Sequence, residues 1–192
     1  MRRYGRAGNG RRARIVLDVL QLIDLVGEWS MLALMVALAL SGCAAQDAHY
    51  VLRDHPDVRA EFHQVASGPQ WPSHLALRLH STSSGRDAWF LPWNGGSDGS
   101  QHMASTTDVT APGWHAPDPE GGPRPLGDVS YIGTDVDYRV FSEVPRLGAP
   151  APAHFLLPDL REAVWYRARQ DQRLDVARQF FDLDGCTAQK RS

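Results

Sequence analysis

The stretch Ser73-His-Leu-Ala-Leu-Arg-Leu-His80 carries the clearest structural signal in the sequence. Leucine occupies every second position, at 75, 77 and 79, which is the period of a β-strand with one face in the core. The next residues, Ser81-Thr-Ser-Ser-Gly85, are typical of a turn, and residues 87–91 form a second strand-like run. The two runs predict an antiparallel hairpin. Because Pro92 lacks an N–H, we expect it to end the second strand or to leave that strand at an edge.

Further strand signals lie toward the C-terminus. Residues 129–132 and 136–144 are β-prone runs separated by the turn Gly133-Thr-Asp135, so they predict a second hairpin. The apolar run at residues 154–157, followed by Pro158, favours a short buried strand.

Two segments favour helix. In residues 54–66, Val58 and Phe62 lie four residues apart, and an aspartate at the start can cap the first turn. Residues 159–184 contain no proline or glycine and begin Asp-Leu-Arg-Glu, in the style of a capping box. Within them the spacing of residues 173–183 fits a helix or a strand, and we expect a short helix followed by a final strand.

These elements predict a single β-rich α+β domain of antiparallel hairpins, with a short helix near each end and long Gly/Pro loops. The whole chain has 192 residues, of which 43% are hydrophobic and 22% are charged, and this size and composition fit one ordinary globular domain. We assign residues 1–42 to a leader, 43–53 to a tether, 54–186 to the domain and 187–192 to a C-terminal tail.

Charge is distributed unevenly along the chain. Six arginines but only three acids precede Cys43, so residues 43–192 hold 14 basic and 19 acidic residues, a formal charge of −5. Nucleic-acid binding normally requires Lys and Arg clustered on one face. The acidic balance therefore excludes nucleic acid as an expected partner.

Residues 31–40 are ten uncharged apolar residues, the length of a signal-peptide hydrophobic region and too few for a membrane span. Leu40-Ser41-Gly42-Cys43 follows directly. This sequence resembles the lipobox of bacterial lipoproteins at every position: an aliphatic residue, two small residues and a cysteine. The small side chains let a protease approach the backbone, and a thiol is the nucleophile that diacylglycerol can alkylate.

The resemblance implies that a signal peptide is cleaved between Gly42 and Cys43. Cys43 would then become the N-terminus, carrying a thioether-linked diacylglycerol and a further palmitate-type chain, which together anchor a protein stably to a membrane. The absence of aspartate in Ala44-Ala45-Gln46 implies the outer membrane of the cell envelope rather than the inner one.

Three alternatives stay open for this region. In the first, Cys43 is a buried thiol at the end of a hydrophobic helix. In the second, residues 15–26 and 31–40 form one membrane segment, which Asp18, Asp24 and Glu28 disfavour. In the third, the unusually long leader reflects a start-site error. A start at Met31 would, however, remove the arginines that hold a leader in the cytoplasm.

One catalytic string occurs in the sequence. Gly95-Gly96-Ser97-Asp98-Gly99 satisfies the G-x-S-x-G pattern of serine hydrolases, but that elbow needs a buried strand before the serine and a helix after it. Pro92 and Asn94 precede the string, and no amphipathic period follows it. We therefore expect a glycine-rich turn and keep Ser97 as an alternative nucleophile.

Other candidate residues are scattered. The eight histidines show no metal-binding spacing, so we expect no metal and no cofactor. Trp93 and Trp114 border the Gly/Pro-rich residues 94–128, where they either bind a partner through the loops or pack a small core. Cys186 has no internal partner if Cys43 is lipidated, and a Cys43–Cys186 disulfide would compete for the same sulfur.

The sequence as a whole predicts a noncatalytic cell-envelope lipoprotein with a binding or structural role and an envelope protein, glycan or lipid as partner. The alternative is a small envelope hydrolase using Ser97 or a His/Asp pair. Reach between Ser97 and a histidine in the folded chain would discriminate the two.

Overall fold

The computed structural model describes residues 42–95 and 99–187. The chain divides into two compact units, Met1–Gly42 and Cys43–Ser192. The second unit therefore begins at the cysteine of the lipobox-like motif. The apolar run 31–40 and Ser97 lie outside the described residues. Among those described, no helix is both long enough and apolar enough to cross a membrane.

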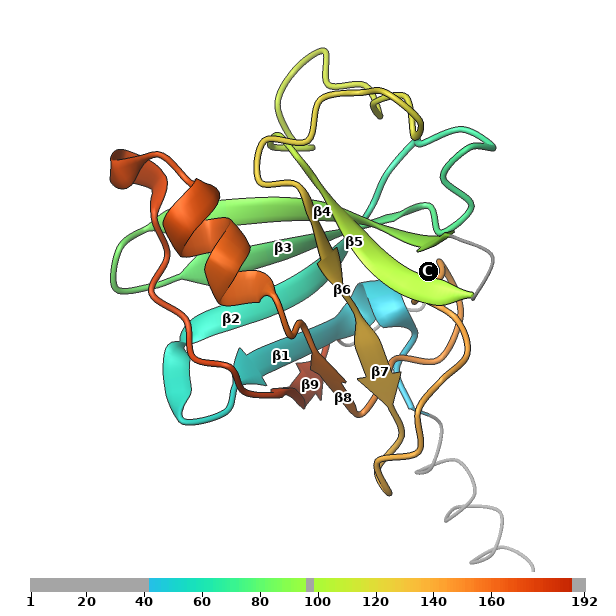
Figure 1. Cartoon of the computed structure of the whole chain (residues 1–192). Helices are drawn as coiled ribbons and strands as arrows, with labels where there is room; N and C mark the ends of the chain where they lie inside the picture. The colour runs from blue at the N-terminus through green and yellow to red at the C-terminus, as the bar shows by residue number, and fades with distance from the viewer. Residues whose placement is uncertain (1–41, 96–98, 188–192) are drawn as a thin grey trace, which may run out of the picture. The chain divides into compact units, whose positions relative to one another are not determined.

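The second unit is built around one antiparallel sheet of nine strands in the order β6-β5-β4-β3-β2-β1-β9-β8-β7 (Figure 1). The strands are β1 (Ala48–Leu52), β2 (His55–Gln64), β3 (Leu75–Ser81), β4 (Arg86–Gly95), β5 (Ser100–Thr106), β6 (Asp128–Ser130), β7 (Ile132–Thr134), β8 (His154–Leu156) and β9 (Phe181–Cys186). Only Tyr131 separates β6 from β7 in the chain, although these strands are the two edges of the sheet. One bent segment thus pairs with β5 and then with β8, and the sheet forms a nearly closed barrel.

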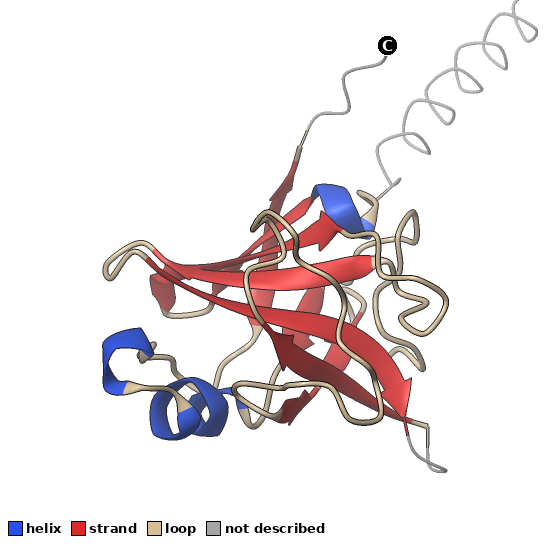
Figure 2. Cartoon of the chain, turned by 90° about the horizontal axis from the view of Figure 1, so that it is seen from above, coloured by secondary structure: helices blue, strands red, loops and turns tan. Residues whose placement is uncertain are grey.

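The expected α+β class is wrong, because the described fold is nearly all sheet. Its helical segments are η1 (Ala45–Asp47), η2 (Glu162–Arg167) and η3 (Gln170–Gln172), of which η2 is one short π-helix and the others are 3-10 turns. All three lie at the periphery of the sheet (Figure 2). The short helix expected after Asp159 corresponds to η2, whereas the strand expected within residues 173–183 overlaps β9 only from Phe181 onward.

The helix expected at residues 54–66 is strand β2. Val58, Ala60 and Phe62 are buried inside the barrel, and Arg59 and Glu61 between them point outward. This alternation has the period of two that a strand requires. The sequence favoured a helix because Val58 and Phe62 are large and four residues apart, whereas the small Ala60 between them is a weak hydrophobic signal. Asp54, the expected cap, instead adopts a positive φ of 63° in the turn between β1 and β2.

The hairpin predicted from residues 73–91 is confirmed as β3 and β4, with Leu77 opposite Phe90. The expectation for Pro92 is half right. Strand β4 continues through Pro92 to Gly95, but Pro92 lies beyond the last β3–β4 pair and pairs only with Met103 of β5. Pro92 therefore has a strand partner on one side only, as a residue of an edge strand has.

Three other expectations are corrected. Part of the loop expected at residues 94–128 is strand β5, whose Met103 and Ala104 are buried. The expected hairpin at 129–144 does not form: residues 128–134 make β6 and β7, and residues 136–144 lie outside any strand. The expected tether 43–53 contains η1 and β1, and β1 lies between β2 and β9. The expected strand at 154–157 is confirmed as β8.

Side chains fill the inside of the barrel. Phe155 lies at the centre of an aromatic group, with ring centroids 4.9 Å from Tyr50, 4.7 Å from Phe181 and 5.8 Å from Tyr131. A second cluster covers the outer face of β3–β5. It contains Trp89 of β4 and Trp71 from the β2–β3 connection, and Trp114 from the β5–β6 connection packs against it. Buried side chains thus pack the barrel interior as a core.

Candidate functional site

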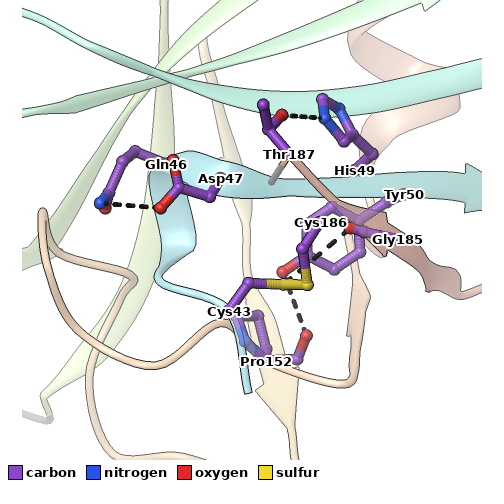
Figure 3. Close-up of a disulfide and its surroundings, with 9 residues drawn as sticks. All are labelled: Cys43, Gln46, Asp47, His49, Tyr50, Pro152, Gly185, Cys186 and Thr187. Carbon is purple, nitrogen blue, oxygen red and sulfur yellow. Dashed lines mark hydrogen bonds between the residues drawn. A yellow bond between two sulfur atoms is a disulfide. The ribbon is translucent and has the colours of Figure 1, made fainter. Parts of the chain in front are cut away.

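Cys43 is joined to Cys186 by a disulfide, with Cα atoms 5.8 Å apart (Figure 3). Cys43 is the first residue of the barrel unit and Cys186 ends β9, which places both at the same end of the barrel. The backbone at Cys43 and just after it is also hydrogen-bonded to residues 149–151. Ala151 N donates to Cys43 O at 2.8 Å, and Ala45 N donates to Ala149 O at 2.9 Å.

The disulfide and the thioether implied by the lipobox exclude each other, because each uses the sulfur of Cys43. The bond closes a loop of 143 residues. In the chain-entropy account, closing a loop of that size stabilises a fold by up to about 5 kcal/mol. Acylation of Cys43 would therefore also remove the covalent link between the first residue of the barrel unit and the end of β9.

The two tryptophans expected at a binding loop belong to the outer cluster instead. Trp93 and Trp114 both pack against Trp89 and its neighbours as partly buried side chains. Trp114 Nε1 donates to Thr106 Oγ1 at 3.3 Å, and the Trp93 ring lies 5.2 Å from that of His102. Core packing, the second of the two expected roles, fits this arrangement.

The hydrolase alternative finds little support around Ser97. Ser97 itself lies outside the described residues, but Gly95 at the end of β4 pairs with Ser100, and the described chain continues from Ser100 as strand β5 rather than as a helix. The strand-turn-helix geometry of a nucleophile elbow is therefore missing from this connection. The nearby Ser100 Oγ lies 2.8 Å from His102 Nε2.

A histidine–aspartate pair does occur on β8 and β9. His154 Nδ1 is 2.7 Å from Asp182 Oδ1, and Arg53 donates to both oxygens of that carboxylate at 2.8 and 2.7 Å. The Arg53 hydrogen bonds, with the one from His154, hold the pKa of Asp182 below its ordinary value. The His154 ring stacks on Tyr138 and lies edge-on to Phe180, and none of the ring's described hydrogen bonds is with a serine, threonine or cysteine.

A row of paired charges crosses the outer face of β1–β4. This outer-face ladder consists of His49, Glu61, His63, Arg78, His80 and Asp87. Arg78 joins its two carboxylates, donating to Glu61 at 3.0 Å and to both oxygens of Asp87 at 3.0 and 3.1 Å. Burial raises the pKa of each carboxyl, but the hydrogen bonds outweigh it and the net pKa of both is lowered.

We expect Arg78→Met to flatten the acid-side loss of stability. Carboxylates with lowered folded-state pKa values stabilise the fold above their unfolded pKa values, about 4, and this stability is lost as pH falls through the folded values. Removing Arg78 raises the folded pKa values of Glu61 and Asp87. Urea unfolding should give the variant about 1 kcal/mol less stability at neutral pH and a shallower decline between about pH 5 and 3. Arg59→Met on the same face should keep the wild-type slope, and equal slopes for all three proteins would contradict the account.

A hollow of about 380 Å³ lies where β4 extends beyond the end of β5. We call it the β4–η2 pocket. Its apolar wall includes Trp89, Leu126 and Val164, and its polar groups include Asp108, Asp171 and Gln172. A volume of this size, with apolar walls and a few polar groups, suits a small ligand or one side chain of a partner. Sequence reasoning missed it because its walls come from positions 86 to 172.

Among the described residues, no group of three or more His, Cys, Asp or Glu side chains is placed to hold a metal ion. No family model, curated protein or solved structure matches the chain.

Proposed function

We propose that this chain is an exported lipoprotein of the bacterial cell envelope, most consistent with the outer membrane, whose barrel acts as a noncatalytic binding domain. The observation that carries the proposal is the coincidence of two boundaries. The compact barrel unit begins at Cys43, the residue at which the lipobox-like motif implies cleavage. Under this proposal Cys43 is the mature N-terminus and carries the acyl chains.

The order of synthesis favours the thioether over the disulfide. Cys43 precedes the whole barrel, whereas Cys186 follows it by 143 residues at the end of the last strand. During export, the sulfur of Cys43 would therefore reach a lipid-transferring enzyme at the membrane before Cys186 is in place. The Cys43–Cys186 bond would be the form of the unacylated domain. An unanchored, disulfide-closed exported protein is the second candidate, and the geometry of the two cysteines favours it.

Membrane fractionation in a bacterial host tests the proposed anchor. We expect the wild type and Cys186→Ser to sediment with membranes and to enter the detergent phase, because both proteins retain the acylated sulfur of Cys43. Cys43→Ser should be released into the soluble fraction or retain its leader. If Cys43→Ser fractionates like the wild type, with the same mature N-terminus, the anchor is not at Cys43.

The β4–η2 pocket is the surface through which we propose that the domain binds. A photo-crosslinking amino acid at the exposed rim position Gln172 should give a discrete adduct in intact cells, and the same probe at exposed Gln70, outside the pocket, should not. Adducts of equal yield at both positions, or none at Gln172, would contradict a binding role for this pocket.

A further inference from the structure

Exposed large apolar side chains gather in one loop of the described barrel. Six such side chains are exposed, and five of them belong to residues 136–147: Val136, Tyr138, Val140, Phe141 and Leu147. Val136 and Val140 are 74% and 65% exposed. Valine has little reason to occupy such positions in a solvated loop, so the clustering calls for a partner surface.

This apolar loop, residues 136–147, leaves the barrel at the end that holds Cys43. Strand β7 leads into it at Thr134, and β8 returns from it at His154, opposite Thr134. The segment just after the loop contacts the N-terminus directly, because Ala44 bridges to Pro150 and Ala151 N donates to Cys43 O. Residues 141–147 of the loop therefore share one end of the barrel with the site of acylation, because Phe141 O accepts from Gln101 and Leu147 N donates to Ser73 O. The Tyr138 side chain reaches back along the barrel wall to Arg53.

No tether separates the acylation site from the barrel. Ala45 is fully buried, and its N–H donates to Ala149 O, so the first residues after Cys43 are already part of the fold. Acyl chains on Cys43 would therefore leave directly from the barrel surface. The barrel end that carries residues 141–147, next to Val140, would then be held against the bilayer.

The loop is also built to present its valines. Asp135 N donates to Arg139 O at 3.1 Å, and the Tyr138 hydroxyl accepts from Arg53 at 2.8 Å, which fixes the turn between Val136 and Val140. Tyr138 has a φ of 60°, a left-handed conformation that bulky residues rarely adopt. Strain of this kind tends to persist where function requires it.

The charges of the loop are paired within it. Arg139 lies 2.6 Å from Asp137, and Arg146 lies 2.8 Å from Glu143. Paired charges offer no surplus of positive charge for anionic lipid headgroups. Contact with a bilayer would therefore rest on the apolar side chains and would change little with salt.

From these observations we infer that residues 136–147 insert their apolar side chains into the headgroup–acyl boundary of the membrane to which Cys43 is anchored. The inference rests on the proposed function, because the anchor supplies the bilayer. It makes the loop a second, noncovalent contact that sets the orientation of the barrel.

The test uses the lipidated chain with Cys186→Ser, in which an acylated Cys43 leaves no free thiol. An environment-sensitive dye is attached through Val140→Cys, and in a matched protein through Ser84→Cys, in the β3–β4 turn at the other end of the barrel. In zwitterionic phosphatidylcholine vesicles, we expect blue-shifted emission at 140, quenched by lipid-borne nitroxides and unchanged by salt, and neither effect at 84. Replacing both valines by aspartate should speed transfer between vesicles about tenfold or more.

The outcomes separate the two claims. If the protein stays on vesicles but the dye at 140 reports water, the inference is overturned while the anchor stands. A blue shift that depends on protein concentration without vesicles would mean that a second copy covers the loop, which also overturns it. If the dye labels Cys43 itself, that sulfur is not acylated and the proposed function fails.

Discussion

Phe155→Ala should lower the free energy of unfolding by about 3–5 kcal/mol, enough to unfold much of the domain at 37 °C. Phe155 is fully buried, and its ring contacts four other aromatic rings inside the barrel. Its removal leaves a cavity that strands from both ends of the chain would have to close. Urea unfolding of the soluble domain measures the effect.

Two controls define the meaning of that result. Phe155→Leu retains most of the apolar volume and should cost about 1–2 kcal/mol, and Tyr166→Ala, at a 64% exposed position, should stay within about 0.5 kcal/mol of the wild type. A Phe155→Ala variant as stable as Tyr166→Ala would show that the barrel interior is not the core of this protein.

Cys186→Ser should destabilise one form of the protein strongly and the other hardly at all. In the leaderless domain produced under oxidising conditions, we expect a loss of about 2–5 kcal/mol, because the bond closing a 143-residue loop is removed. In the lipidated protein the same change should cost less than about 0.5 kcal/mol, since Cys43 is already alkylated. Chemical denaturation with and without a reductant measures both, and reductant should abolish the difference in the first form only.

A large effect of Cys186→Ser in the membrane-extracted protein would be evidence against acylation of Cys43. A small effect in the oxidised leaderless domain would mean that the disulfide contributes little to the fold. The two results are independent, so each can be contradicted alone.

Local sequence patterns predicted some strands well and others poorly. The β3–β4 hairpin was readable because three leucines alternate with polar residues and a Ser/Gly turn follows. Strand β2 was read as a helix because Val58 and Phe62 fit both periods, and only the burial of Ala60 between them reveals a strand. Strand β5 lies in a polar stretch, and its two apolar residues face opposite sides, Met103 toward the barrel core and Ala104 toward the outer cluster.

Residues 136–144 show the opposite error. Val136, Tyr138 and Val140 alternate as a strand would, yet the structure leaves all three exposed in a loop. The alternating side chains are exposed rather than buried, and the local sequence does not distinguish these two cases.

The closure of the barrel and the candidate site depend on contacts between distant residues. Pairing of β1 with β9 joins residues more than 120 positions apart, and it is this pairing that brings Cys186 to Cys43. Cys43 could be singled out from its local motif, whereas the β4–η2 pocket could not, because no local pattern links its walls.

The intact mass of the mature protein, purified with detergent from a bacterial host, tests the central claim most directly. We predict a chain that begins at Cys43 and carries the added mass of a diacylglycerol, with or without a third acyl chain, and a free thiol at Cys186. A chain lacking that added mass and two hydrogens lighter than the reduced form, with Cys43 linked to Cys186, would contradict the lipoprotein account and leave the disulfide-closed exported barrel in its place.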